Sequence, residues 1–215
     1  MYKTIRLGKI KTSKLELIDI AKAWLAISIA FALVFSGIRL LNGTISNIFT
    51  ISFGVMFLIS LFTAGIGFLL HELAHKFAAQ YYGCTAEFRA FDQMLYIAVG
   101  LAALAGFIFA APGAVMIAGH ITRKENGIIS AAGPLTNYVL GLAFLGLMFL
   151  FPAFSLVFSI GFQINFWLGL FNMIPFMNFD GKKILDWNNY VWIAMVIFGA
   201  VAINLFGLRT MLLGF

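Results

Sequence analysis

Two histidines and a glutamate within five positions are the residues best suited to chemistry in this chain. His71, Glu72 and His75 form a His-Glu-x-x-His motif. Residues four apart share one face of an α-helix, so the two imidazoles can offer nitrogens to one metal ion. Glu72 lies beside them, where a carboxylate can act on water at the metal. Zinc is the metal that two histidines and a carboxylate most often hold.

The motif lies in an unusual setting, because residues 51–70 are almost all apolar and carry no charge. Ionisable side chains are costly deep in an apolar span, and those that occur there usually serve a function. The simpler interpretation is a pair of core histidines with a chance glutamate. That interpretation suits an isolated histidine better than three ionisable residues together.

The composition indicates an integral membrane protein. Of the 215 residues, 62 % are apolar and 10 % are charged, whereas soluble domains have about a quarter charged. The net charge of +6 does not indicate nucleic-acid binding, because the basic residues flank apolar runs, as membrane topology requires. We expect a single domain over residues 1–215.

Apolar runs predict an all-α polytopic membrane protein with about five to six transmembrane helices. The clearest runs cover residues 20–41, 51–82, 128–151, 154–170 and 190–208. The basic segment 1–19 predicts either an interfacial strand or helix, or a solvated tail. Its charge places the N-terminus in the cytoplasm, and the active-site side with it, in a multi-pass protein of the cell membrane.

The apolar segment from Leu95 to His120 is too short for two helical crossings. We expect a helix from Leu95 to Phe109 and then an extended return through Val115, which would form a short membrane-embedded hairpin or strand near the active site. Such a strand must be shielded from lipid and would offer an edge to another chain. The alternative is a single tilted span with inverted topology after it.

A catalytic zinc site needs a third protein ligand. A three-histidine scheme fails, because Ala78 and Tyr81 stand where glycine and histidine are required. Glu87 and Glu125 lie in charged loops. Asp180 ends an apolar run in a segment punctuated by proline and glycine, and it is the preferred third ligand.

Two further residues have simpler interpretations. Asp186 follows two lysines and is expected to be a solvated ion-pair partner. His120 borders a basic loop, so we expect a surface or interfacial histidine, with a sensing role as the alternative.

Three motifs, taken together, resemble the site-2 protease family of intramembrane zinc metalloproteases. They are His71–His75, Gly133-Pro134-Leu135-Thr136-Asn137, and Asn172-Met173-Ile174-Pro175 leading to Asp180-Gly181. The resemblance covers a core of about residues 51–186. Pro112–Val115 looks like a short version of the family's membrane-embedded hairpin, and the chain is similar to minimal members without a PDZ domain.

The resemblance implies one Zn²⁺ per chain held by His71, His75 and Asp180, with Glu72 as general base. Asn172 and Asn137 would hold the oxyanion or the substrate backbone, and an unwound transmembrane substrate would pair near Val115. The expected partners are a transmembrane protein substrate and the lipid bilayer, without nucleic acid; the oligomeric state stays open.

Two other functions stay open. One is a non-catalytic membrane metal-binding protein, either a pseudoprotease or a metal-transport component. Glu72 discriminates, because a structural or transport site does not need an unligated carboxylate beside its zinc. The other is a membrane metalloenzyme with a non-peptide substrate.

Overall fold

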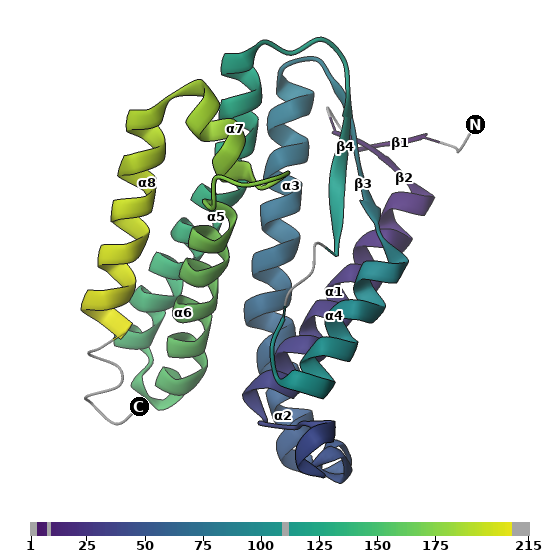
Figure 1. Ribbon diagram of the computed structural model, residues 1–215, viewed down its shortest axis with the longest axis vertical. Helices are drawn as coiled ribbons and strands as arrows, with labels where there is room; N and C mark the ends of the chain where they lie inside the picture. The colour runs from purple at the N-terminus through teal and green to yellow at the C-terminus, as the bar shows by residue number, and fades with distance from the viewer. Residues whose placement is uncertain (1–3, 8–9, 109–111, 208–215) are drawn as a thin grey trace. The chain divides into compact units, whose positions relative to one another are not determined.

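The computed structural model describes residues 4–7, 10–108 and 112–207, which form two compact units (Figure 1). The first unit joins the chain up to Leu69 with Glu87–Met116, and the second joins Leu70–Ala86 with the chain from Ile117 onward. Among the described residues, five helical segments are long and apolar enough to cross a membrane: Lys14–Asn42, Ile51–Tyr81, Arg123–Leu150, Pro152–Asn172 and Asn189–Phe206. The prediction of an all-α polytopic membrane protein is confirmed.

The first unit is built around α1 (Lys14–Phe35), which packs against α2 (Ile51–Ser60) and α4 (Asp92–Ala105). A π-helical turn, Leu61–Gly65, follows α2, and Trp24 Nε1 donates a hydrogen bond to Leu61 O at 3.1 Å. The basic N-terminal segment forms an antiparallel pair of strands, β1 (Thr4–Leu7) and β2 (Ile10–Ser13). The sequence left a strand, a helix and a solvated tail open for this segment, and the structure shows strands.

A second strand pair, β3 (Thr85–Ala90) and β4 (Gly113–Ala118), flanks α4 along the chain. The pair is antiparallel, because Thr85 Oγ1 bonds Ala118 O at 3.1 Å and Phe91 N bonds Pro112 O at 3.0 Å. The expected helix followed by an extended return is therefore present, and a single tilted span is excluded. That helix, α4, ends at Ala105 because Gly106 adopts the left-handed conformation, so the predicted end at Phe109, which itself lies outside the described residues, is too late.

The two stretches expected to be charged loops, around Glu87 and Glu125, are regular structure. Glu87 lies in β3, whose backbone pairs with that of β4. The charged stretch 121–127 begins α5 (Arg123–Leu150), because Thr122 and Glu125 form a capping box.

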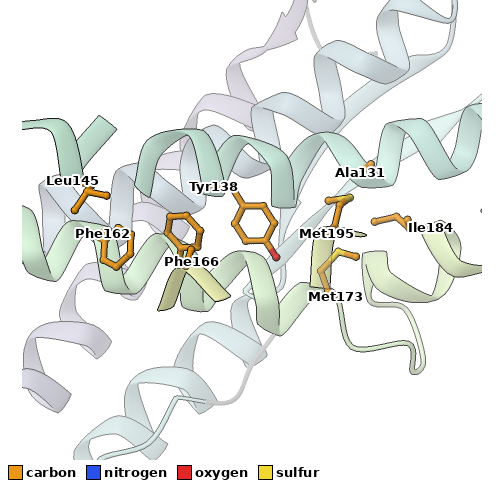
Figure 2. Close-up of a cluster of buried hydrophobic side chains, with 9 residues drawn as sticks. Ala131, Tyr138, Leu145, Phe162, Phe166, Met173, Ile184 and Met195 are labelled. Carbon is orange, nitrogen blue, oxygen red and sulfur yellow. The ribbon is translucent and has the colours of Figure 1, made fainter. Parts of the chain in front are cut away.

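The second unit contains α5, α6 (Ser155–Asn172), α7 (Asp180–Trp187), α8 (Asn189–Ala202) and most of α3 (Ile66–Tyr81). Tyr138 from α5 stacks on Phe166 from α6, with ring centroids 5.2 Å apart, at the centre of its apolar core (Figure 2). The short helix α7, which hydropathy did not reveal, starts at Asp180. This core fixes the helices that carry the candidate site.

Candidate metal centre

Three buried side chains of the second unit converge on one point. His71 Nε2 and His75 Nε2, one helical turn apart on α3, are 3.0 Å from each other. Asp180 Oδ2, from the first turn of α7, lies 3.3 Å from His71 Nε2 and 3.1 Å from His75 Nε2. These are the two imidazoles and the carboxylate that the sequence singled out as metal ligands.

The outer nitrogen of each imidazole is also engaged. His75 Nδ1 lies 2.8 Å from Ile129 O, and His71 Nδ1 lies 2.6 Å from Asn137 Oδ1. A carbonyl oxygen only accepts hydrogen bonds, so Nδ1 of His75 carries the proton and its Nε2 has a free lone pair. Metal-binding histidines commonly donate their other N–H in this way.

The three converging atoms fit a zinc ion. Two imidazole nitrogens and one carboxylate oxygen are a known catalytic donor set for this metal, and the three lie within 4.8 Å of one another. A carboxylate must be ionised to act as a metal ligand, and a metal ion at this point would favour the ionised form of Asp180.

Gly133 on α5 leaves the space in front of the two imidazoles. A Cβ atom added there would lie 2.6 Å from His71 Nε2 and closer still to His75 Nε2. Any side chain at this position would meet the nitrogens that face the metal. The glycine of the Gly-Pro motif thus contributes to the site by leaving room for the metal ligands.

The segment between α6 and α7 is held so that Asp180 points inward. Trp192 Nε1 donates a hydrogen bond to Met173 O at 2.8 Å. A Cβ atom at Gly181 would lie 2.8 Å from Met173 Cα and closer to its carbonyl group, so only glycine allows this approach. Asp180 is thereby fixed by a backbone contact on one side and by the start of α7 on the other.

Glu72 lies next to His71 on α3 and is half-buried. It is within electrostatic reach of His71, His75 and Asp180, but it is not one of the three converging ligands. The arrangement therefore supplies a carboxylate beside the metal ligands rather than a fourth ligand.

The other residues considered from the sequence have different surroundings. Asn172 ends α6 and its Nδ2 donates to Leu168 O at 2.9 Å, Val115 belongs to β4, and His120 is exposed. The three acidic residues set aside as ligands have partners of their own: Glu87 pairs with Arg89, Glu125 accepts from Thr122 N at 2.7 Å, and Asp186 pairs with Lys182 at 2.5 Å.

Sequence reasoning missed two parts of the site. One is the Ile129 carbonyl, which no side-chain pattern reveals. The other is Asn165 on α6, which is fully buried and bonded to Asn137. An amide inside an apolar span was the available signal.

Two known proteins are similar to this chain in sequence. A stretch of 142 residues, 64 % of this chain, is 45 % identical to a Methanocaldococcus jannaschii protein named "Putative zinc metalloprotease", of which it spans 74 %. A stretch of 161 residues, 73 % of this chain, is 27 % identical to a second protein of that organism, named "Zinc metalloprotease", of which it spans 39 %. No family model and no solved structure matches. With its His71, His75 and Asp180 centre and the extent of the first match, the chain belongs to the site-2 protease family of zinc metalloproteases.

Proposed function

We propose that this protein is an intramembrane metalloprotease with one zinc ion per chain, which hydrolyses a peptide bond in or near a transmembrane segment of another protein. The observation that carries the proposal is the buried convergence of His71, His75 and Asp180 with Glu72 beside it. Both histidines belong to Ile51–Tyr81, one of the helical segments apolar enough to cross a membrane. The names of the two relatives point to the same chemistry.

Zinc held by His71, His75 and Asp180 would polarise the scissile carbonyl and lower the pKa of water toward about 7. Glu72 then accepts a proton from the attacking water and delivers it to the nitrogen of the leaving amine. Its place beside the ligands, and outside the ligand set, suits this exchange.

We propose different roles for the two asparagines. The side-chain oxygen of Asn137 faces His71 Nδ1, and its amide nitrogen donates a hydrogen bond to Asn165. We therefore assign it to the support of the ligand. Asn172 is the residue proposed to donate a hydrogen bond to the oxyanion or to the substrate backbone.

The proposed substrate is a transmembrane helix that unwinds locally and pairs with β4 near Val115. Within the described residues the β3–β4 sheet has two strands, so β4 has a second edge that bears no strand of this chain. Basic flanking residues favour a cytoplasmic N-terminus and a metal centre on the cytoplasmic side of the cell membrane.

The test is cleavage of a generic transmembrane substrate in detergent, with zinc content measured on every sample. We expect Glu72→Gln to keep about one zinc per chain and lose cleavage, and Asp180→Ala to lose zinc as well. Asp186→Asn is the matched control, because Asp186 is an exposed acid paired with Lys182 and lies on the same short helix as Asp180. It should cleave like the wild type.

Equal cleavage by the wild type and Glu72→Gln would overturn the hydrolytic role of Glu72. Zinc bound to a wild type that cleaves none of a panel of transmembrane substrates would favour a non-catalytic metal-binding protein instead.

A further inference from the structure

A chain of buried amides connects His71 to the backbone of α6. Asn137 Oδ1 lies 2.6 Å from His71 Nδ1, and Asn137 Nδ2 donates to Asn165 Oδ1 at 3.1 Å. Asn165 Nδ2 in turn donates to Gly161 O at 2.8 Å. Asn137 and Asn165 have no exposed surface, so water does not compete for these bonds.

The direction of every bond in this chain is set at its far end. Gly161 O is a backbone carbonyl and can only accept, so the nitrogen of the Asn165 amide must face it. The side-chain oxygen of Asn165 then faces Asn137, so the amide nitrogen of Asn137 must donate the hydrogen bond to it. The oxygen of Asn137 is left to face His71, and Nδ1 of His71 must donate.

Both histidines therefore donate a hydrogen bond from Nδ1 to a carbonyl oxygen. His75 Nδ1 donates directly to Ile129 O, and His71 Nδ1 donates to a carbonyl group that two amides orient. Each imidazole thereby keeps its proton on Nδ1 and turns the lone pair of Nε2 toward Asp180 and the metal.

We propose that Asn165 is a positioning residue of the metal centre, which transmits the polarity of the Gly161 carbonyl through Asn137 to His71. Without Asn165, the Asn137 amide nitrogen loses this acceptor, so the opposite orientation, with the NH₂ group toward His71 Nδ1, becomes relatively more favourable. That orientation favours the tautomer with the proton on Nε2, where a ligand needs a lone pair. The inference rests on the proposed metal centre, but not on its peptidase activity.

The first measurement is zinc affinity by chelator competition, in detergent, for the wild type and Asn165→Leu. Leucine has the same number of side-chain heavy atoms and the same branching at Cγ as asparagine and suits an apolar span, but it cannot accept a hydrogen bond from Asn137. Losses of groups that orient metal ligands weaken binding by about 10- to 100-fold, and we expect a loss in that range. Ser159→Ala is the control: Ser159 is another buried polar residue of α6, bonded to Gln163, and should leave affinity within about twofold.

The second measurement separates polarity from packing. In an Asn137→Asp background, either carboxylate oxygen accepts the proton of His71 Nδ1, so the tautomer of His71 no longer depends on the orientation of Asn165. We expect Asn165→Leu to weaken zinc binding by at least about tenfold when Asn137 is present. The double variant N137D/N165L should bind zinc less than about threefold more weakly than N137D alone.

Each outcome decides the inference. Wild-type affinity in Asn165→Leu, or equal losses in the two backgrounds, would overturn it, and the second result would assign Asn165 to packing alone. If Asn165→Leu fails to fold in both backgrounds, Asn165 serves packing and the inference is overturned. A wild type that binds no zinc would instead overturn the metal centre itself.

Discussion

Ionisable side chains gather in both units of this protein, but they gather differently. In the first unit, Asp19, Lys22, Glu87, Arg89 and Asp92 form a cluster, which we name the Asp19 cluster. Lys22 Nζ lies 3.1 Å from Asp19 Oδ1 and 2.6 Å from Asp92 Oδ1, and Arg89 pairs with Glu87 and reaches Asp19 at 3.9 Å. In the metal centre, the three facing atoms are two imidazole nitrogens and a carboxylate oxygen, all of them able to donate a lone pair.

The difference shows what separates a structural cluster from a site. Every acid of the Asp19 cluster is paired with Lys22 or Arg89, so these charges are compensated by side chains without a metal ion. Converging lone pairs repel one another unless a cation or protons stand between them. An ionisable residue in an apolar helix indicates a site most clearly when the groups that meet it are also lone-pair donors rather than residues of opposite charge.

Gly133→Ala should break the metal centre and produce the largest effect. The added methyl group would enter the space in front of His71 Nε2 and His75 Nε2. We expect zinc affinity to fall by about 100-fold or more, at or beyond the upper end of the effects of groups that only orient the ligands. Alanine favours a helix over glycine by about 1 kcal/mol, so the fold of α5 should not suffer.

Gly146→Ala, on the same helix, is the control for Gly133→Ala. A Cβ atom there meets nothing within 4 Å, so zinc affinity and cleavage should stay at wild-type level. Equal zinc affinity in both glycine variants would refute the role of Gly133.

The sequence predicted the fold where local signals were strong. The apolar runs located the helices that could span a membrane, and the short length of the segment before His120 favoured a helix followed by a strand over a single tilted span. It missed β3, because Thr85–Ala90 mixes charged and apolar residues and becomes a strand through its pairing with β4. Pairing between distant segments is a tertiary effect that local composition does not encode.

At the site, the sequence favoured residues whose chemistry is visible in their type. His71, His75 and Asp180 were chosen as ligands, and the structure places them together. It did not reveal the supports, because these depend on distance. The Ile129 carbonyl is a backbone group, Gly133 acts through the room it leaves, and Asn165 matters through its bond to Asn137.

Asp19→Ala should have a smaller effect than Gly133→Ala, and it should lower the stability of the fold rather than zinc binding. Asp19 is buried, and its loss removes its ion pairs with Lys22 and Arg89, while Lys22 keeps Asp92 and Arg89 keeps Glu87. We expect the free energy of unfolding to fall by about 1–2 kcal/mol, with zinc per folded chain unchanged. Denaturant unfolding in detergent and metal analysis of the folded fraction measure the two quantities. Loss of zinc without loss of stability would contradict the distinction between the clusters.

Asp92→Ala should have the smallest effect. The Asp92 side chain is 59 % exposed, and its partner Lys22, 40 % exposed, retains Asp19. An exposed pair of this kind contributes about 0–1 kcal/mol, and its position in the first turn of α4 adds a similarly small dipole term. We expect unfolding to become easier by less than about 1 kcal/mol, and the difference from the wild type to shrink in high salt. A cost larger than that of Asp19→Ala would mean that the exposed rim, rather than the buried carboxylate, holds the Asp19 cluster together.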